Sequence, residues 1–445
     1  MENADSAFIR RTYAHFATTG VSLDGVVDGD EHTRYRSDPV WESQEVPGTT
    51  NPKSCLPDVL QERLACVDRY GFFDATAGAR VPPRVLPNSA YRKGRGIRRV
   101  GDAHFSNTVD LNTAKKARES DTRARVREVK RISKWASMFS SRPLSDTRDT
   151  EHSLGVGDSF RLVAPAVKFQ RRVYKGIPDR WRAVAWMALA SKHGDGPNAI
   201  SDECDALQLR PSKHDVQIDL DVPRTMRGHV QFHTRYGSGQ CGLFAVLHAT
   251  SLLCQECGYC QGMGPLAAVL LCYLTPTNAY SLLVQLHDDY SFHDFFRPGF
   301  PGLREIFYVQ QHLTSALLPG LHAVMQVNGI VPSAYATSWY MTLFSSTLPF
   351  STQLRVWEAF LLDGRDVLVC VALAILHAYA PYAGHANAAD WLLEALSAPQ
   401  VPENDDVLMH WVEYAVHNRH VRSIIDEARL DWSAMPDDAQ ESLFL

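Results

Sequence analysis

Gly258-Tyr259-Cys260-Gln261-Gly262-Met263 stands between two strongly apolar segments of this chain. The segments at 243–257 and 265–274 are long and uninterrupted enough to predict buried helices. Gly258 suits the end of the first helix, because a residue without Cβ readily takes the left-handed conformation that closes a last turn. Pro265 suits the first turn of the second helix. The six residues therefore form a tight loop with Gln261 at its tip, and local evidence alone favours a solvated amide there.

The same helical periodicity extends on both sides of this loop, from about Phe160 to Leu396. No stretch of alternating apolar and polar residues in this range is long enough to predict a sheet. Helix-breaking residues recur at intervals that give helices of ordinary length and short loops. These breaks fall at Gly176, 194–197, 237–242, Gly258, 298–302, Pro349 and Pro381. We therefore predict an all-α fold of many helices.

Length and composition indicate an ordinary soluble protein. A chain of 445 residues predicts two or three domains, and 45% apolar with 21% charged residues is typical of globular proteins. Met1–Asp5 does not begin a secretory signal peptide. The longest apolar stretch, Val367–Ala380, falls short of the ~20 residues that span a bilayer. We expect a cytoplasmic protein.

Charge is distributed unevenly along the chain. The net charge of −5 argues against a general nucleic-acid binder. Residues 91–134 nevertheless contain fourteen Lys or Arg against five Asp or Glu, whereas residues 385–445 contain twelve acids against three bases. The basic segment is either a solvated surface or a site of peripheral contact with anionic membranes, and both interpretations stay open.

The flanking regions give weaker signals. Residues 1–54 are polar and lack periodicity, which predicts a flexible tail. Cys55–Tyr70 has the spacing of a short amphipathic helix, and a longer helix is predicted from Asn112 to about Phe139. Residues 75–110, between these helices, predict an extended linker. Asp406–Leu430 supports one or two further helices.

Three patterns suggest cofactors but are incomplete. Residues 237–242 fit G-x-G-x-x-G, yet the preceding residues 229–236 are too polar for the buried strand that a dinucleotide site requires. Cys254, Cys257 and Cys260 match three positions of an iron–sulfur motif whose fourth position holds Gly264, so buried thiols are the simpler interpretation. His229 and His233 lack the glutamate of a zinc-protease helix and are interpreted as surface residues. No phosphate-binding loop or nucleophile elbow occurs.

One polar group remains, in the stretch Ile218-Asp219-Leu220-Asp221-Val222-Pro223-Arg224-Thr225. Pro223 disfavours helical geometry at Val222, so we expect Arg224 on an extended or turn segment. Asp221, three residues earlier, is expected to hold the guanidinium by charge-assisted hydrogen bonds. Such an arginine suits phosphate recognition, although a structural ion pair is the commoner outcome.

The chain resembles the TBC-domain family of Rab GTPase-activating proteins. Ile218, Asp221 and Arg224 match its I-x-x-D-x-x-R motif, and Tyr259, Gln261 and Gly262 match its Y-x-Q-G motif. Further matches, in the family's order, are Gly176-Ile177-Pro178 with Arg182 and Trp186, Trp339–Phe344, Leu348–Phe350, Leu354–Glu358 and Asp363-Gly364. Two departures are Tyr340 for a common Phe and Asn278-Ala279-Tyr280 for the usual acid-Ala-Phe. The resemblance covers about half the chain.

Composition, periodicity and the resemblance together predict an organisation into four parts, of which only the TBC domain rests on the resemblance throughout. These are a flexible tail at 1–54, a lead-in segment with helices and basic linker at 55–160, a TBC domain at 161–396, and an acidic helical extension at 397–445. The resemblance also implies regulation of vesicle trafficking and intracellular protein transport. The partner would be a GTP-bound Rab-family GTPase, and no nucleic acid is expected.

The resemblance also implies a mechanism in trans. Arg224 would be the arginine finger and Gln261 the glutamine that orients the hydrolytic water. Asp221 would brace Arg224, with Ile218, Tyr259 and Gly262 supporting the two loops, while Arg182 and Trp186 are either structural or at the edge of the interface. The chain would turn over no substrate of its own and bind no cofactor, because Mg²⁺ and GTP belong to the GTPase. A catalytically idle Rab-binding adaptor is the alternative.

Overall fold

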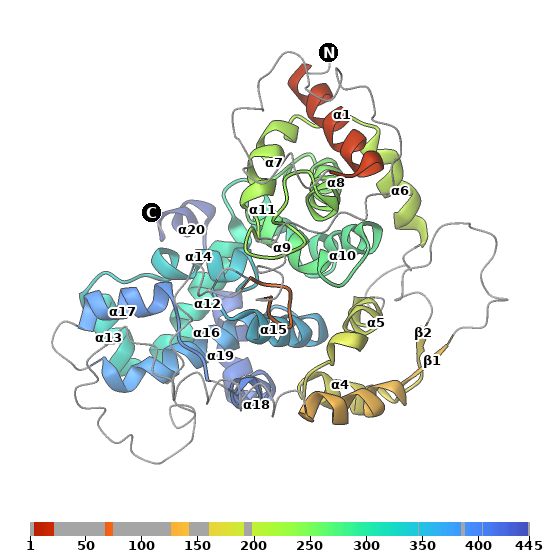
Figure 1. Cartoon of the computed structure of the whole chain (residues 1–445). Coiled ribbons are helices and arrows are strands. Elements are labelled where there is room, and N and C mark those ends of the chain that lie inside the picture. Colours follow the sequence, from red (N-terminus) through yellow and green to blue (C-terminus); the bar gives the residue numbers. More distant parts are fainter. Residues whose placement is uncertain are drawn as a thin grey trace, which may run out of the picture. The chain divides into compact units, whose positions relative to one another are not determined.

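The computed structural model describes residues 4–21, 67–73, 126–141, 160–190, 198–345, 347–383, 388–402 and 404–443 (Figure 1). Helices dominate these residues, and the only strands among them form one short antiparallel pair. The predicted all-α class is therefore confirmed. The chain divides into two compact units, which are described separately. Unit 1 comprises Met1–Pro82 with Cys204–Cys272, and unit 2 comprises Pro83–Glu203 with Tyr273–Leu445.

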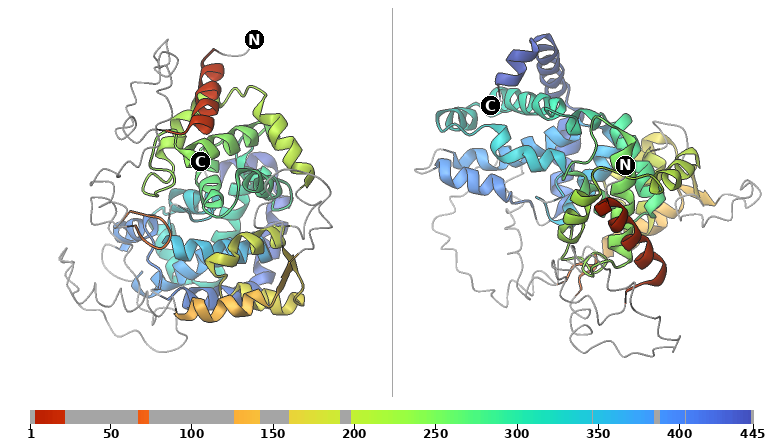
Figure 2. Two further views of the ribbon diagram at one scale, coloured as in Figure 1. Left: turned by 45° about the vertical axis from the view of Figure 1, so that its right-hand side comes forward. Right: turned by 90° about the horizontal axis from the view of Figure 1, so that it is seen from above.

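Unit 1 is built around two apolar helices. Its elements are α1 (Ala4–Thr19), the end of α6 (Asn198–Gln208), α7 (Asp215–Asp221), the 3₁₀ turn η6 (Val222–Arg224), α8 (Ser238–Leu253) and α9 (Met263–Leu271). Helices α8 and α9 pack against each other, and α1 packs on α7 and α8 (Figures 1 and 2). A helix that is apolar on nearly all faces must be buried. This explains why α8 and α9 form the core that supports the loop between them.

Two predictions for the N-terminal region are wrong where the structure describes it. Residues 4–19, assigned to a flexible tail, form the four-turn helix α1. Residues 67–70, assigned to the end of a helix, lie in a turn closed by an antiparallel bridge between Val67 and Phe73. The remainder of the predicted tail, the helix up to residue 66 and the linker at 75–110 lie outside the described residues.

Helix α8 also differs from its predicted extent. It ends at Leu253, because Cys254 is extended with φ −129° and ψ 121°, and residues 255–257 form a turn. Gly258 does adopt the predicted left-handed conformation, with φ 56°. Its N–H donates to the Cys254 carbonyl oxygen and closes this separate turn rather than helix α8.

Unit 2 is a larger helical assembly around α16 (Asp366–Tyr379). Helix α16 is buried on almost every side because α12, α15 and α18 all pack against it. The other elements are β1 (Phe139–Ser141), β2 (Phe160–Leu162), α4 (Ala166–Val173), α5 (Asp179–Ala190), α10 (Pro276–Asp288), α11 (His293–Phe296), α12 (Pro301–Leu317), α13 (Pro319–Val327), α14 (Pro332–Met341), α15 (Phe350–Asp363), η7 (Ala380–Tyr382), α17 (Ala388–Ser397), α18 (Asp405–His417), α19 (Arg419–Ala434) and α20 (Asp437–Ser442). The apolar stretch at 367–380, which is shorter than a bilayer span, thus lies almost entirely within a buried helix.

The predicted helix from Asn112 is described only over residues 126–136. Its C-terminal end packs through Trp135, whose ring lies 5.7 Å from that of Phe169 on α4. The strand β1 that follows pairs with β2 in antiparallel register. Val126 and Val129, earlier on the same helix, are 51% and 68% exposed. The start of this helix and its predicted N-cap lie outside the described residues.

The C-terminal helices α18 and α19 complete unit 2, where α19 lies along α12 and α18 along α16. Asn404 and Asn418 cap these helices, each accepting hydrogen bonds from backbone N–H groups of the following first turn.

None of the helices described is both long and apolar enough to cross a bilayer.

Candidate functional site

Arg224 is presented from a buried base in unit 1. Ile218 is fully buried on α7, and Val222 at the start of η6 is equally buried. The Arg224 side chain, at the end of η6, is exposed. The three-residue turn therefore carries the chain from the core to the surface, with the guanidinium on the outer side.

The backbone before Arg224 differs from the prediction. Val222 has helical geometry, with φ −51° and ψ −51°, although Pro223 follows it. The chain tightens from α7 into the 3₁₀ turn, and the Thr225 N–H closes it by donating to the carbonyl oxygens of both Val222 and Asp221. Because proline has no backbone N–H, its presence in this short turn costs no hydrogen bond. The expectation of an extended Val222 is therefore wrong.

Asp221 does not hold Arg224 as predicted. Among the described residues, no hydrogen bond or ion pair joins their side chains. The buried Asp221 carboxylate instead accepts from the Tyr259 hydroxyl at 3.0 Å and from Gln217 Nε2 at 3.2 Å. Burial, with Asp221 next to it, raises the pKa of Tyr259, so its hydroxyl keeps the proton that it donates. Asp221 thus ties the arginine turn to the loop at 258–263, and the guanidinium has no partner within the described part of the chain.

The loop at 258–263 is packed against the arginine turn. A Cβ at Gly258 would lie 2.3 Å from His214 Nε2, and one at Gly264 would lie 3.1 Å from Thr225 Oγ1. Both positions therefore admit no ordinary side chain without movement. The Met263 N–H donates to the Cys260 carbonyl oxygen and the Gly264 N–H to that of Gln261. These contacts fix the backbone around Gln261.

Gln261 itself is exposed at the tip of the loop, as predicted. Tyr259 and Gly262 on either side are partly buried, and Tyr259 makes the contact with Asp221. Unit 1 therefore presents an arginine and a glutamine from two backbone segments that a shared hydrogen bond joins. Both backbones are held, and neither side chain has a hydrogen-bond partner among the residues that the structure describes. The pair can therefore meet an anionic ligand with little reorganisation.

Arg182 and Trp186 lie on α5 in unit 2 and belong to its core. Trp186 is fully buried against Tyr273 and Trp357. Arg182 is 4% exposed, and its Nε donates to the fully buried Glu358 at 2.9 Å. Of the two roles left open for these residues, burial supports the structural one.

The residues of the three incomplete cofactor patterns have different environments in the structure. Gly237 caps α8, so residues 237–242 are a helix start, and the turns before them do not supply the strand that a dinucleotide site needs. His229, predicted at the surface, is 5% exposed, and its Nε2 lies 2.8 Å from the Tyr70 carbonyl oxygen. Cys254, Cys257 and Cys260 are of intermediate burial, and none of them forms a disulfide with another described residue.

The departure at Tyr340 has a local explanation. Its ring is fully buried on α14, and its hydroxyl donates to Gln310 Oε1 at 2.5 Å. A buried hydroxyl needs such a partner. The substitution of Tyr for Phe is therefore accommodated within unit 2 by Gln310 on α12.

Sequence reasoning missed three residues that support the site. Gln217 bonds Asp221, His214 fills the space beside Gly258, and Tyr13 of α1 contacts α7. The i, i+4 spacing of Gln217 and Asp221 on one helix was available as a signal. Nothing local indicates the contacts of His214 or Tyr13.

Comparison with known proteins gives a consistent family. A family model described as the Rab-GTPase-TBC domain matches residues 179–382. A TBC domain-containing protein of Schizosaccharomyces pombe is 33% identical over 396 residues, which is 85% of this chain and 88% of that protein. The Rab GTPase-activating protein eat-17 of Caenorhabditis elegans is 30% identical over 204 residues, or 46% of this chain and 22% of that protein. Apart from the yeast protein, such relatives are mostly much longer than the matched region.

One solved structure has a comparable fold. The TBC domain of a flagellar RabGAP from Chlamydomonas aligns with a TM-score of 0.52 at 24% identity, covering 68% of this chain and 98% of that chain. Its match supports the helical architecture of the described residues.

Proposed function

The chain belongs to the Rab-GTPase-TBC domain family, and we propose that it accelerates GTP hydrolysis by a Rab-family GTPase with Arg224 and Gln261 supplied in trans. The observation that carries the proposal is the joint presentation of these two residues. Both side chains are exposed, while the Asp221–Tyr259 hydrogen bond joins their backbones. Through this activity the protein would regulate vesicle trafficking and intracellular protein transport.

The roles of the two side chains follow from their chemistry. A guanidinium offers planar, paired donors to the oxygens on which charge develops as the γ-phosphoryl group departs. A glutamine amide can accept from the attacking water with its oxygen and donate to a phosphoryl oxygen with its nitrogen. The proposal assigns Mg²⁺ and GTP to the GTPase, so this chain needs no cofactor of its own.

We expect Gln261→Ala to slow GTP hydrolysis by about 10²-fold, near the loss for removal of one oriented transition-state group. Binding should change little, because Gln261 acts on the water rather than on the docking surface. Single-turnover phosphate release and the affinity for a Rab loaded with a non-hydrolysable GTP analogue measure the two quantities. The matched control is Gln255→Ala, because Gln255 is an exposed glutamine in the preceding turn. Equal losses of affinity and rate would make Gln261 a docking residue instead.

A catalytically idle adaptor is the competing function. It predicts binding of a GTP-loaded Rab with no acceleration by the wild-type chain. A single-turnover assay over a panel of Rab GTPases separates the two, since faster phosphate release with any member establishes activation. The filled arginine and glutamine positions favour the active protein.

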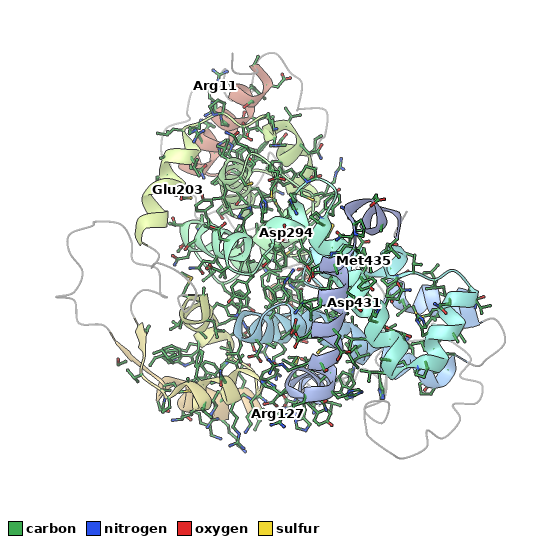
Figure 3. All side chains as sticks on the ribbon, turned by 180° about the vertical axis from the view of Figure 1, so that it is seen from behind. Arg11, Arg127, Glu203, Asp294, Asp431 and Met435 are labelled. Carbon is green, nitrogen blue, oxygen red and sulfur yellow. The ribbon has the colours of Figure 1, made fainter. Side chains whose placement is uncertain are left out.

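We also propose peripheral attachment to anionic membranes through a basic surface of unit 2. The segment considered at 91–134 is described only from residue 126. The helix at 126–136, on which Arg127 is labelled in Figure 3, exposes Arg127, Lys130 and Lys134. Helix α4 adds Lys168 and Arg171, and Lys175 follows two residues after its end. Exposed valines accompany these cations, with Val163 56% and Val167 76% exposed. Cations beside exposed apolar side chains suit a lipid surface better than a soluble anion.

Reversing two of these charges tests the attachment. Lys168→Glu with Arg171→Glu should weaken binding to phosphatidylcholine–phosphatidylserine vesicles by about 2 kcal/mol, or roughly thirtyfold, at ~1 kcal/mol per cation. Co-sedimentation at low and high salt measures the partition, and phosphatidylcholine vesicles give the background. Arg419→Glu with Arg422→Glu on α19 is the matched control, because both arginines are exposed in the same unit. Equal losses in both double variants would contradict this surface.

A further inference from the structure

Helix α1 presents a polar face to the helix that leads to Arg224. Its buried residues are Ser6, Thr12 and Tyr13. Ser6 and Tyr13 are two helical turns apart and therefore lie on one side. Helix α1 is the red helix beside α7 and α8 in Figures 1 and 2, and all three belong to unit 1. The contact is thus a polar seam between α1 and α7.

Among the described residues, two hydrogen bonds cross this seam, together with an ion pair between Arg10 Nε on α1 and Asp215 Oδ2 at 3.9 Å. The Ser6 hydroxyl donates to Asp215 Oδ2 at 2.5 Å, and the Tyr13 hydroxyl donates to Asp219 Oδ1 at 2.9 Å. The two acceptors are four residues apart on α7, so they face the same way. The seam therefore joins α1 to α7 at the first residue of α7 and again one turn later.

Both acceptors are buried carboxylates, which makes their donors important. Asp215 is fully buried and Asp219 is 5% exposed. Besides Ser6, Asp215 accepts from the Ser212 N–H at 3.2 Å and has His248 Nδ1 at 2.6 Å. A buried carboxylate that loses a donor is destabilised by more than the strength of the lost bond. Release of α1 would therefore take a hydrogen-bond donor from each of these two buried carboxylates on α7.

Tyr13 is held from several sides. Its ring stacks on Phe244 of α8, with centroids 4.0 Å apart and planes 6° from parallel. Its hydroxyl accepts from Arg235 at 2.9 Å while donating to Asp219, and Arg235 also pairs with Asp219. Tyr13, Asp219 and Arg235 form a closed triangle, which we call the Tyr13 triangle. Its members come from α1, α7 and the segment before α8.

Helix α7 depends on such contacts because it has only seven residues. A helix this short is not stable by itself in water. It continues directly into η6, whose last residue is Arg224. Asp221 at the end of α7 is held by Tyr259, whereas Asp215 and Asp219 each accept one of their hydrogen bonds from α1. Any shift of α7 therefore moves the base from which Arg224 extends.

We propose that α1 is a positioning element of the arginine turn: Ser6 and Tyr13, bonded to Asp215 and Asp219, hold α7 and thereby set the place of Arg224. This inference rests on the proposed role of Arg224 as an arginine finger. Neither α1 residue touches the GTPase; both act through α7. The N-terminal helix is then part of the activating module.

Tyr13→Phe is the sharpest test, because it removes the hydroxyl and keeps the ring on Phe244. The single-turnover rate constant at saturating activator should fall about tenfold, below the ~10²-fold that a 1 Å misplacement can cost. The activator concentration for half-maximal rate should stay within about twofold of wild type. Tyr414→Phe, an exposed tyrosine on α18, is the matched control. An unchanged rate, or a loss confined to affinity, would overturn the proposal.

A double-variant cycle tests the route through α7. If Tyr13 acts through Asp219, then Tyr13→Phe added to Asp219→Asn should cost little beyond Asp219→Asn alone. Multiplied losses would show that Tyr13 acts by another path. Circular dichroism and the melting temperature of each variant identify any general unfolding.

Hydrogen exchange separates this inference from the proposed function. The amides of residues 215–225 should exchange faster in Tyr13→Phe than in wild type and in Tyr414→Phe. If the wild-type chain accelerates no GTPase, the finger assignment fails, but faster exchange would still establish that α1 holds α7. Unchanged exchange at 215–225 would overturn the proposal even with an active wild-type protein. Ser6→Ala, with Thr18→Ala as its exposed counterpart on α1, repeats the comparison at the other end of the seam.

Discussion

The Arg224→Lys variant is expected to lose nearly all acceleration of GTP hydrolysis, as is Arg224→Ala. Lysine keeps the positive charge but presents a compact ammonium, which cannot reproduce the planar fork of the guanidinium. In the well-studied pair of Ras and its activator, a trans arginine contributes ~10³–10⁵ in rate. That range corresponds to about 4–7 kcal/mol of activation barrier. We therefore expect a loss of at least about 10³-fold for Arg224→Ala.

The environment of Arg224 allows its replacement without disturbing the fold. Arg224 is exposed, and among the described residues it has no side-chain hydrogen bond or ion pair. Its replacement should leave the melting temperature unchanged, since exposed residues without partners contribute little to stability. Arg227→Lys is the matched control, because Arg227 is an exposed arginine three residues further on. Phosphate release at several activator concentrations gives the rate.

Three results would contradict the finger assignment. One is an Arg224→Lys variant with the wild-type rate, because charge alone would then suffice. Another is an equal loss in Arg227→Lys, which would indicate a general electrostatic effect of this surface. The third is a loss of affinity without loss of maximal rate, which would make Arg224 a docking residue.

The two candidate finger residues could be predicted from the sequence, but the way they are held could not. Motif spacing identifies Arg224 and Gln261, and both are exposed as their roles require. The predicted brace from Asp221 to Arg224 is wrong, because a three-residue spacing does not reveal which side chain turns inward. Asp221 turns inward to Tyr259, thirty-eight residues away in sequence. That choice depends on packing between segments, which local pattern does not encode.

Helix α1 shows the same limit more strongly. Its buried face consists of hydroxyl-bearing residues, so its periodicity resembles that of a polar tail. The partners of Ser6 and Tyr13 lie 209 and 206 residues away. Sequence patterns detect a helix when apolar residues repeat on one face. A helix that docks through buried hydrogen bonds escapes that signal. His229 was misplaced for the same reason, since its partner at Tyr70 comes from a distant turn.

Conversely, the apolar segments were predicted well. Helices α8 and α9 are buried on nearly all sides, and each lies where an uninterrupted apolar segment predicts a buried helix. Only their ends differed, as at Leu253, where the apolar run continues into a turn. Burial of continuous apolar surface is a strong local signal. It determines where the core lies but leaves the polar contacts at its edge undetermined.

The Arg182→Met variant is expected to lose about 3–5 kcal/mol of stability, the typical cost of breaking a buried ion pair from one side. Arg182 is buried in unit 2, where Nε donates to Glu358 at 2.9 Å and another nitrogen donates to the Ile177 carbonyl oxygen at 2.9 Å. Methionine retains much of the side-chain volume but leaves the fully buried Glu358 without its main counter-charge. Denaturant unfolding of the full chain measures the change. Arg180→Met, at an exposed arginine of the same helix, should change stability little.

The loss of folding stability in Arg182→Met should also depend on pH. Burial raises the pKa of Glu358, and Arg182 opposes that rise, so its removal should raise the pKa further. The folded variant then keeps a proton that the unfolded chain has lost. Folding stability therefore falls as pH rises from the ordinary glutamate pKa through the folded one. We expect Arg182→Met to be closer to wild type at pH 5.5 than at pH 7.5.

The decisive comparison also removes the charge of Glu358, which Arg182→Met leaves without its main counter-charge. Arg182→Met combined with Glu358→Gln should recover part of the lost stability at pH 7.5 and lose the added pH dependence, because glutamine does not titrate. The Ile177 N–H, which donates to Glu358 at 3.0 Å, would keep an acceptor in the amide oxygen. A double variant less stable than Arg182→Met, with unchanged pH dependence, would mean that the loss arises from packing rather than charge. Recovery would instead identify Arg182 as the counter-charge that allows a carboxylate in the core of unit 2.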